Sequence, residues 1–184
     1  EEITAEQAVE AGRAFLGADR AQRAADMQGP IPCWGVAAQK GGVAVNMQVT
    51  RQGGKILWMA PETAGFDAAL EMDACVERAQ VFLAEHGFGR MQPSFTQQYD
   101  GLAVVSFVAE QDGVILYPDL VKAQVRMDTG DVVGLEANNF WMNHMQRENL
   151  TPAVDESQAL RAVSGRLTVT GARLCVIPVD DGLN

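Results

Sequence analysis

The sequence has few of the residues from which metal centres and disulfide frameworks are built. Its 184 residues include two histidines, His86 and His144, and three cysteines, Cys33, Cys75 and Cys175. The cysteines are odd in number, far apart and without a Cys-x-x-Cys pair, so they predict neither a disulfide framework nor a metal clamp. The histidines are 58 residues apart with no acidic cluster beside them, which does not favour a zinc site. We expect no cofactor and no metal.

Long apolar runs and positive charge are also scarce. No window approaches the roughly 20 consecutive apolar residues of a transmembrane helix, so we expect no membrane contact by this fragment. The first residues are neither a signal peptide nor a natural initiation site, which suggests that any anchor lies upstream. Lys and Arg total 14 against 24 Asp and Glu, a net charge of -10. This balance repels a phosphate backbone and excludes nucleic acid as an expected partner.

What the sequence does contain is internal repetition of helix starts. Thr4 with Gln7, and Asp155 with Gln158, read as capping boxes, and a weaker copy begins near residue 70. An apolar helical stripe recurs at an offset of 67 residues. Its members are Ala8, Val9, Gly12, Phe15 and Leu16 in the first copy, and Cys75, Val76, Ala79, Phe82 and Leu83 in the second.

The first two copies then change their hydrophobic period from 3.6 to 2, which indicates strands. Residues 43–50 and 55–59 flank the turn 52–54, and residues 121–127 and 131–135 flank the turn 128–130, at an offset of 76. A further apolar strand is predicted over residues 102–108. A helix followed by antiparallel strands, twice over, predicts an α+β fold of tandem modules, each a helix packed on a small antiparallel sheet.

These repeats divide the chain into a first module over residues 1–63, a second over 64–148 and the start of a third over 149–184. The third, truncated module offers one strand candidate, residues 173–177, and no hairpin. That strand must either pair with a neighbouring sheet or leave an open edge.

The helix stripe with its strands and turn resembles the PepSY module. The stretch 113–125, residues 129–137 and the later pair Asn143-His144 are more particular, and together they resemble the YpeB family of spore germination proteins. Two features depart from the family pattern: Phe140-Trp141 stands where a tyrosine-containing pair is usual, and the third module is truncated.

The resemblance implies a role rather than a reaction. A member of this family is expected to be a non-enzymatic regulatory and stabilising partner of a SleB-like cortex-lytic hydrolase. It would reside outside the cytoplasm, at the inner membrane and cortex of the spore, tethered by an upstream segment. PepSY modules elsewhere are linked to peptidase inhibition, which leaves an inhibitor or self-chaperone as the alternative, with a peptidase as partner.

The triplet Asp128-Thr129-Gly130 also occurs in aspartic peptidases, where two such carboxylates share a proton. Only one copy is present, and the matching turn 52–54 of the first module contains no acid. Turn chemistry therefore explains the triplet better, since Asp hydrogen-bonds a turn and Gly supplies positive φ. An aspartic peptidase using Asp128 remains as a remote alternative.

Four residues are predicted to form a partner-binding surface: Tyr117, Pro118, Trp141 and His144. Pro118 interrupts a strand-like path and implies an edge, bulge or bend. His144 lies between the second and third modules, where a plainer interpretation is that it ties the linker to a module by hydrogen bonds. No catalytic residue is predicted.

The remaining histidine and the cysteines receive structural interpretations. His86 is placed at a helix C-terminus, where its ring meets the last carbonyls. Cys75 and Cys175 are predicted to be small core residues, and Cys33 is predicted to lie in a loop.

Overall fold

The computed structural model describes residues 1–179. The elements, in chain order, are α1 (Ala5–Leu16), β1 (Arg20–Ala24), β2 (Cys33–Lys40), β3 (Val43–Thr50), β4 (Ile56–Pro61), α2 (Met72–Glu85), β5 (Gln92–Tyr99), β6 (Leu102–Gln111), β7 (Val114–Arg126), β8 (Val132–Glu136), α3 (Asn138–Asn143), α4 (Glu156–Ala162) and β9 (Cys175–Val176).

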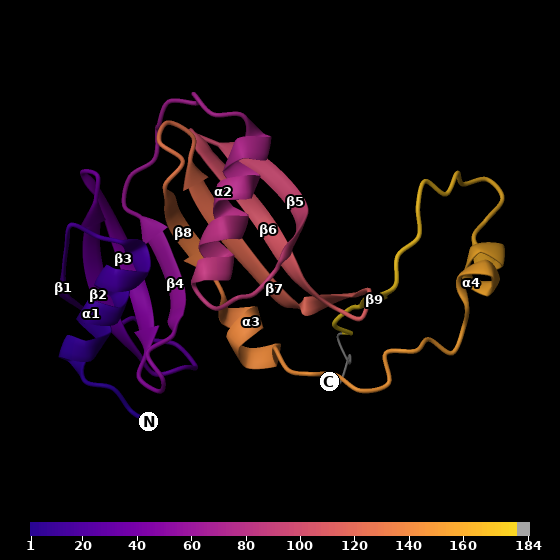
Figure 1. The fold of residues 1–184 in the computed structure, drawn as a ribbon, viewed down its shortest axis with the longest axis horizontal. Helices are drawn as coiled ribbons and strands as arrows, with labels where there is room; N and C mark the ends of the chain where they lie inside the picture. The colour runs from indigo at the N-terminus through magenta and orange to yellow at the C-terminus, as the bar shows by residue number, and fades with distance from the viewer. Residues whose placement is uncertain (180–184) are drawn as a thin grey trace.

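Each half of the molecule is a helix followed by four strands, which confirms the predicted α+β class. The strand order is β1-β2-β3-β4-β8-β7-β6-β5, with β9 pairing to β7, so the two halves share one nine-stranded sheet over the described residues. Antiparallel pairing of β4 with β8 joins the halves. Figure 1 shows this continuous sheet with α1 and α2 against it.

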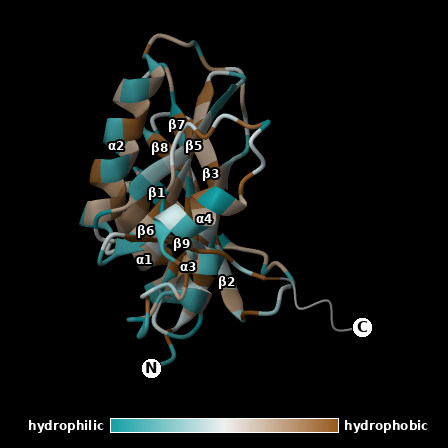
Figure 2. Ribbon diagram, turned by 90° about the vertical axis from the view of Figure 1, so that its right-hand side faces the viewer, coloured by the Kyte–Doolittle hydropathy of each residue, from teal (hydrophilic) through white to brown (hydrophobic). Residues whose placement is uncertain are grey.

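The core lies between the sheet and the two long helices. In the side view of Figure 2, α1 and α2 lie on the same side of the strands. The alternating residues of β3 that were predicted to face the core, Val43 to Val49, are buried. So are Leu16 of α1 and Leu83 of α2, because the helical stripes face the sheet.

The two helices meet through equivalent residues. The rings of Phe15 and Phe82 pack edge to face with centroids 5.3 Å apart. His86 stacks on Phe82, and its Nδ1 lies 2.6 Å from the Phe82 carbonyl oxygen. This confirms the predicted position of His86 at the end of a helix.

The two matching turns are closed by an equivalent backbone hydrogen bond. The Thr50 N–H donates to the Lys55 carbonyl at 2.8 Å, and the equivalent Arg126 N–H donates to the Asp131 carbonyl at 2.9 Å. Gly130 has a φ of +80°, the left-handed conformation that glycine adopts most easily. The interpretation of residues 128–130 as a hairpin turn is confirmed.

The strands β1, β2 and β5 were not predicted. The sequence gives no signal for β1 and β5, because both are exposed edge strands with no apolar alternation. The loop placement of Cys33 was wrong, since it begins β2 and is buried. The core placement of Cys175 was also wrong: its strand lies at the end of a segment that packs little, and the residue is exposed.

The third repeat has little structure of its own. Its predicted capping box is present, with the Asp155 carboxylate accepting from the Gln158 N–H at 2.8 Å, but α4 contains no buried residue. The strand β9 pairs in parallel with Ile115 and Leu116 of β7, one of the two outcomes expected for it. The last five residues of the predicted third module, 180–184, lie outside the described residues.

None of the helices in residues 1–179 has the length and hydropathy required to cross a bilayer.

Candidate functional site

A bulge in β7 begins the candidate site. In the register between β6 and β7, Phe107 pairs with Val121, and Ala109 pairs with Leu116. Four residues of β7, 117–120, therefore lie opposite the single residue Val108 of β6. The ladder breaks at Pro118, which has no N–H to donate, so the predicted bulge is confirmed.

The bulge turns Asp119 inward, where its side chain is completely buried. Nδ1 of His144 lies 2.7 Å from Asp119 Oδ2, and Arg147 Nη1 donates to the same oxygen at 2.9 Å. The hydrogen bond with Asp119 raises the pKa of Arg147 further above its ordinary value. A buried carboxylate requires such partners, and here both come from the linker after α3.

A second contact fixes the same linker. The Gln111 side chain donates to the Arg147 carbonyl at 2.8 Å and accepts from the Arg147 N–H at 2.9 Å. The linker is therefore held to the β6–β7 hairpin by the contacts of His144 and Arg147 with Asp119 and by the two hydrogen bonds with the Gln111 amide. The interpretation of His144 as a residue that ties the linker to a module is confirmed. Asp119, Arg147 and Gln111 were not predicted as site residues.

Helix α3 supports this cluster with aromatic packing. The buried Phe140 contacts Phe88 with ring centroids 5.0 Å apart, and His144 stacks on Phe140 at 4.3 Å. Trp141 donates its Nε1–H to the Ile56 carbonyl of β4 at 3.0 Å. Trp141 therefore links α3 to the first half of the chain, and His144 links it to the second.

The four predicted surface residues separate into two groups. Asn143 Nδ2 lies 3.3 Å from the Pro118 carbonyl, which brings Pro118 close to His144, and Trp141 belongs to the same short helix. Tyr117 instead lines a hollow of about 690 Å³ with Pro93, Val108 and Cys175. We call the first group, Pro118, Trp141 and His144, together with Asp119 and Arg147, the α3 corner. No observation tests its role in partner binding.

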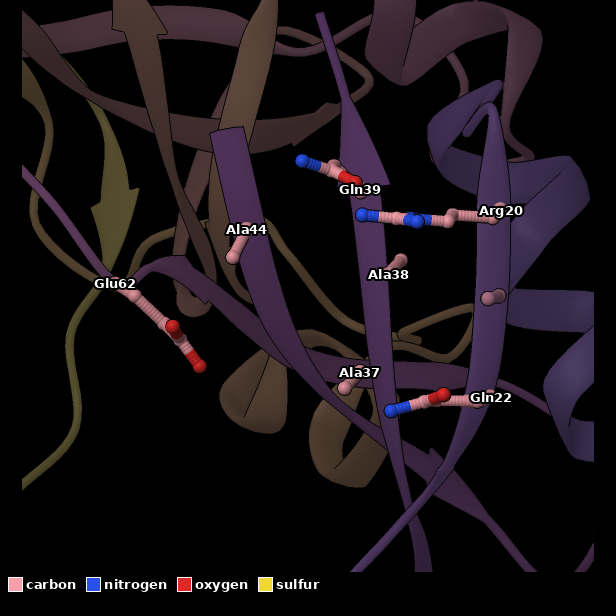
Figure 3. A pocket seen from close by; sticks show the side chains of 8 residues that line it. Arg20, Gln22, Ala37, Ala38, Gln39, Ala44 and Glu62 are labelled. Atoms are coloured by element: carbon pink, nitrogen blue, oxygen red, sulfur yellow. The ribbon is translucent and has the colours of Figure 1, made fainter. Parts of the chain in front are cut away.

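A different hollow, of about 430 Å³, lies over β1, β2 and β3 and contains none of the predicted residues. Figure 3 shows the side chain of Arg20 extending from β1 across β2, beside Gln39, with Glu62 on the opposite rim. It has no cluster of ligating side chains, and in residues 1–179 as a whole no group of three or more His, Cys, Asp or Glu residues could hold a metal ion.

The geometry of Asp128 does not favour peptidase chemistry. Its carboxylate accepts two hydrogen bonds from the Arg126 guanidinium, at 3.0 and 2.6 Å. These bonds lower the pKa of Asp128. A catalytic carboxylate pair must share a proton, whereas this environment stabilises the ionised form.

Residues 1–150 match the family model described as YpeB sporulation, PepSY1 and PepSY2 domains. The chain belongs to this family. Since the match covers both halves of the shared sheet, the two repeats seen in the structure lie within the region of the YpeB family that carries its first two PepSY domains. The boundary at residues 63 and 64 stays a prediction.

Two curated relatives support the same family. The chain is 32% identical over 136 residues to the sporulation protein YpeB of Halalkalibacterium halodurans, covering 74% of this chain and 30% of the relative. It is 28% identical over 140 residues to YpeB of Bacillus subtilis, covering 75% and 31% respectively. The chain thus spans about a third of the length of these relatives.

The fold has been observed before in this family. The Bacillus megaterium YpeB C-terminal domain matches with a TM-score of 0.85 at 24% identity, covering 98% of this chain and 83% of that chain. The match places the third repeat, as well as the first two, within a known YpeB fold. The names of these relatives connect the YpeB family with sporulation.

Proposed function

We propose that this chain is a non-enzymatic partner that regulates and stabilises a cortex-lytic hydrolase of the SleB type during spore germination. The observation that carries the proposal is the family match over residues 1–150. The proposed location is outside the cytoplasm, between the inner membrane and the cortex of the spore. Such a location is compatible with a chain whose cysteines are all unpaired over the described residues, because its fold does not depend on disulfides.

We place the partner surface on Met142 and Met145, two exposed side chains that the α3 corner supports. Proteins recognise one another through apolar anchors held on a rigid support. Here Met142 and Met145 are 62% and 64% exposed on either side of His144. The contacts of Asp119 and Trp141 fix the backbone beneath them. Methionine side chains adapt easily to a partner surface.

Binding of this chain to the purified hydrolase, measured by biolayer interferometry, tests the proposal. We expect a saturable complex that Met142→Glu weakens about 10-fold or more, as at an interface anchor. Val81→Glu is the matched control, since Val81 is also exposed on a helix, at 57%, but lies on α2. No association of the unmodified chain with the hydrolase would refute the partnership.

The exposed edge of the sheet favours peptidase inhibition as a second candidate. Strand β5 carries no charged residue and leaves Phe95 and Tyr99 exposed at 61% and 70%, and an open strand can pair with an extended peptide chain. Inhibition of a peptidase by the chain, abolished by Thr96→Pro, would support it. Full peptidase activity at saturating chain concentration would exclude it.

A further inference from the structure

A pocket of about 450 Å³ lies beside the α3 corner, between the turn 50–55, the loop before β2 and α3 itself. Pro32, Leu57 and Trp141 form apolar walls, and Arg51 and Lys55 contribute cationic side chains. It is formed almost wholly by the first half of the chain, with Trp141 as the contribution of the second. Apolar walls with a few convergent polar groups are typical of ligand sites.

Arg51 has hydrogen-bonding capacity that the described residues do not use. Its guanidinium lies 4.0 Å from the centroid of the Trp34 ring, and one nitrogen donates to Asp26 at 3.2 Å. An arginine has five N–H donors. Its Nε is buried, and within residues 1–179 it is the one buried side-chain polar atom without a partner. Because Nε is buried, a ligand would reach the guanidinium through its Nη donors, and the Arg51 side chain is 36% exposed.

The Lys55 ammonium group can also bind an anionic ligand. Its Nζ lies 4.8 Å from the centroid of the Trp141 ring, and the side chain is exposed. Among the ion pairs of residues 1–179, Lys55 takes no part. Trp141 therefore holds the ammonium group at the pocket through a cation–π contact without neutralising it.

The charge at this pocket is opposite in sign to that of the whole chain. The residues that line the pocket include two cations, Arg51 and Lys55, and no carboxylate. Asp26, which pairs with Arg51 and with Arg23, lies outside this lining. Glu1 and Glu2 run beside the turn through backbone contacts, but their side chains form no ion pair with these cations. The net charge of the chain is -10, so a pocket lined by two cations and no carboxylate is a place where an anionic ligand can bind.

We infer that this pocket binds an acidic segment of a protein partner. A carboxylate of the segment would be held by Lys55 and the free donors of Arg51. A neighbouring apolar side chain would pack on Pro32, Leu57 and Trp141, contacts that a small anion cannot make. The inference rests on the proposal that the chain acts by binding another protein, but it concerns a surface distinct from Met142 and Met145.

Peptide binding, followed by tryptophan fluorescence and calorimetry, tests the inference. The probe is a capped Gly-Leu-Glu-Glu-Leu-Gly peptide, compared with the same peptide in which Gln replaces Glu, and with sodium acetate. We expect saturable binding of the Glu peptide, at least about 10-fold weaker binding of the Gln peptide, and weakening by salt. Acetate that competes at the same concentration as the Glu peptide would overturn the assignment of a protein segment.

Charge-removing variants locate the site. Lys55→Gln and Arg51→Gln should each reduce affinity for the Glu peptide about 3- to 5-fold, as expected for partly exposed ionic contacts. Arg161→Gln on α4 makes the same change in net charge away from the pocket and should have no effect. Lys55→Gln is the decisive variant, because Lys55 is exposed and its loss leaves the fold intact, whereas Arg51 also holds Asp26. Unchanged affinity in Lys55→Gln, or an equal loss in Arg161→Gln, would overturn the site.

The same variants separate this inference from the proposed function. If Lys55→Gln weakens binding of the Glu peptide as expected but leaves hydrolase binding unchanged, the pocket serves an acidic segment of another protein, and the result supports the site alone. Hydrolase binding without any binding of the Glu peptide supports the partnership and overturns the pocket. Binding of the Glu peptide without binding of the hydrolase supports the pocket and refutes the partnership.

Discussion

Met59 of β4 lies directly opposite Leu135 of β8 at the junction of the two halves. The hairpins match at an offset of 76 residues, so these are equivalent positions paired with each other. Phe15 and Phe82, equivalent at the helix offset of 67, also contact each other. Contact between equivalent residues is what a two-fold axis produces. The two repeats are therefore arranged as in a symmetric dimer, fused into one chain.

The first prediction concerns this junction. Leu135→Ala should lower the free energy of unfolding by about 2–4 kcal/mol, because Leu135 is fully buried and its truncation leaves a cavity between the halves. Urea denaturation followed by tryptophan fluorescence and circular dichroism should show one coincident transition, since the sheet is continuous. Val81→Ala is the control and should change little. Two separate transitions would contradict a shared cooperative sheet.

The second prediction concerns the linker after α3. Asp119→Asn removes the buried charge that pairs with Arg147 and His144. It should destabilise the protein by about 2–4 kcal/mol, since an unpaired charge then remains in a largely buried setting. Hydrogen exchange should lose protection over residues 138–147 first. Asp67→Asn, at an exposed position, should have no such effect, and retained protection in Asp119→Asn would show that the aromatic packing alone holds the linker.

The third prediction is a pH dependence at the turn 128–130. Hydrogen bonds from Arg126 lower the pKa of Asp128 in the folded state. Their stabilisation is therefore complete above the unfolded pKa of about 3.9 and is lost as the pH falls through the lower, folded pKa. Asp128→Asn should cost about 1 kcal/mol at pH 7, and the difference from the unmodified chain should shrink below about pH 4. Urea titrations at several pH values measure it; a constant difference would refute the ion pair.

The fourth prediction concerns the loop that forms one wall of the pocket. A Cβ on Gly35 would lie 2.0 Å from the Ala25 carbonyl oxygen, whereas a Cβ on Gly29 would meet nothing within 4 Å. Gly35→Ala should therefore displace residues 25–32 and destabilise the protein by about 1–3 kcal/mol, with loss of the acidic-peptide site. Gly29→Ala should leave thermal stability and peptide binding unchanged. Equal melting temperatures for the two variants would contradict the close approach.

Much of the fold followed from local patterns. The stripe from Ala8 to Leu16 and the alternation of Val43 to Val49 each report which face is buried, because burial selects apolar residues at the period of the element. The edge strand β5, with the sequence Gln-Pro-Ser-Phe-Thr-Gln-Gln-Tyr, could not be predicted this way. It is exposed on nearly every residue, so burial leaves no periodic signal in it.

The candidate site was predictable only in part. Pro118 and His144 were found because proline breaks a ladder and histidine is rare in this chain. Asp119 could have been suspected from its position after Pro118, but its partner Arg147 is 28 residues away and no local pattern connects them. Arg51 and Lys55 read as ordinary turn residues until Trp34 and Trp141 are placed beside them.

The sequence by itself determined the repeated helix-and-hairpin units, the turn identity of Asp128 and the family, because these depend on local periodicity and on order along the chain. The tertiary structure alone decided that β4 joins β8, that Asp119 meets Arg147, and that Trp141 lies beside Lys55. Each of these depends on residues far apart in the chain, whose proximity follows only when the two apolar helix faces are buried against one common sheet.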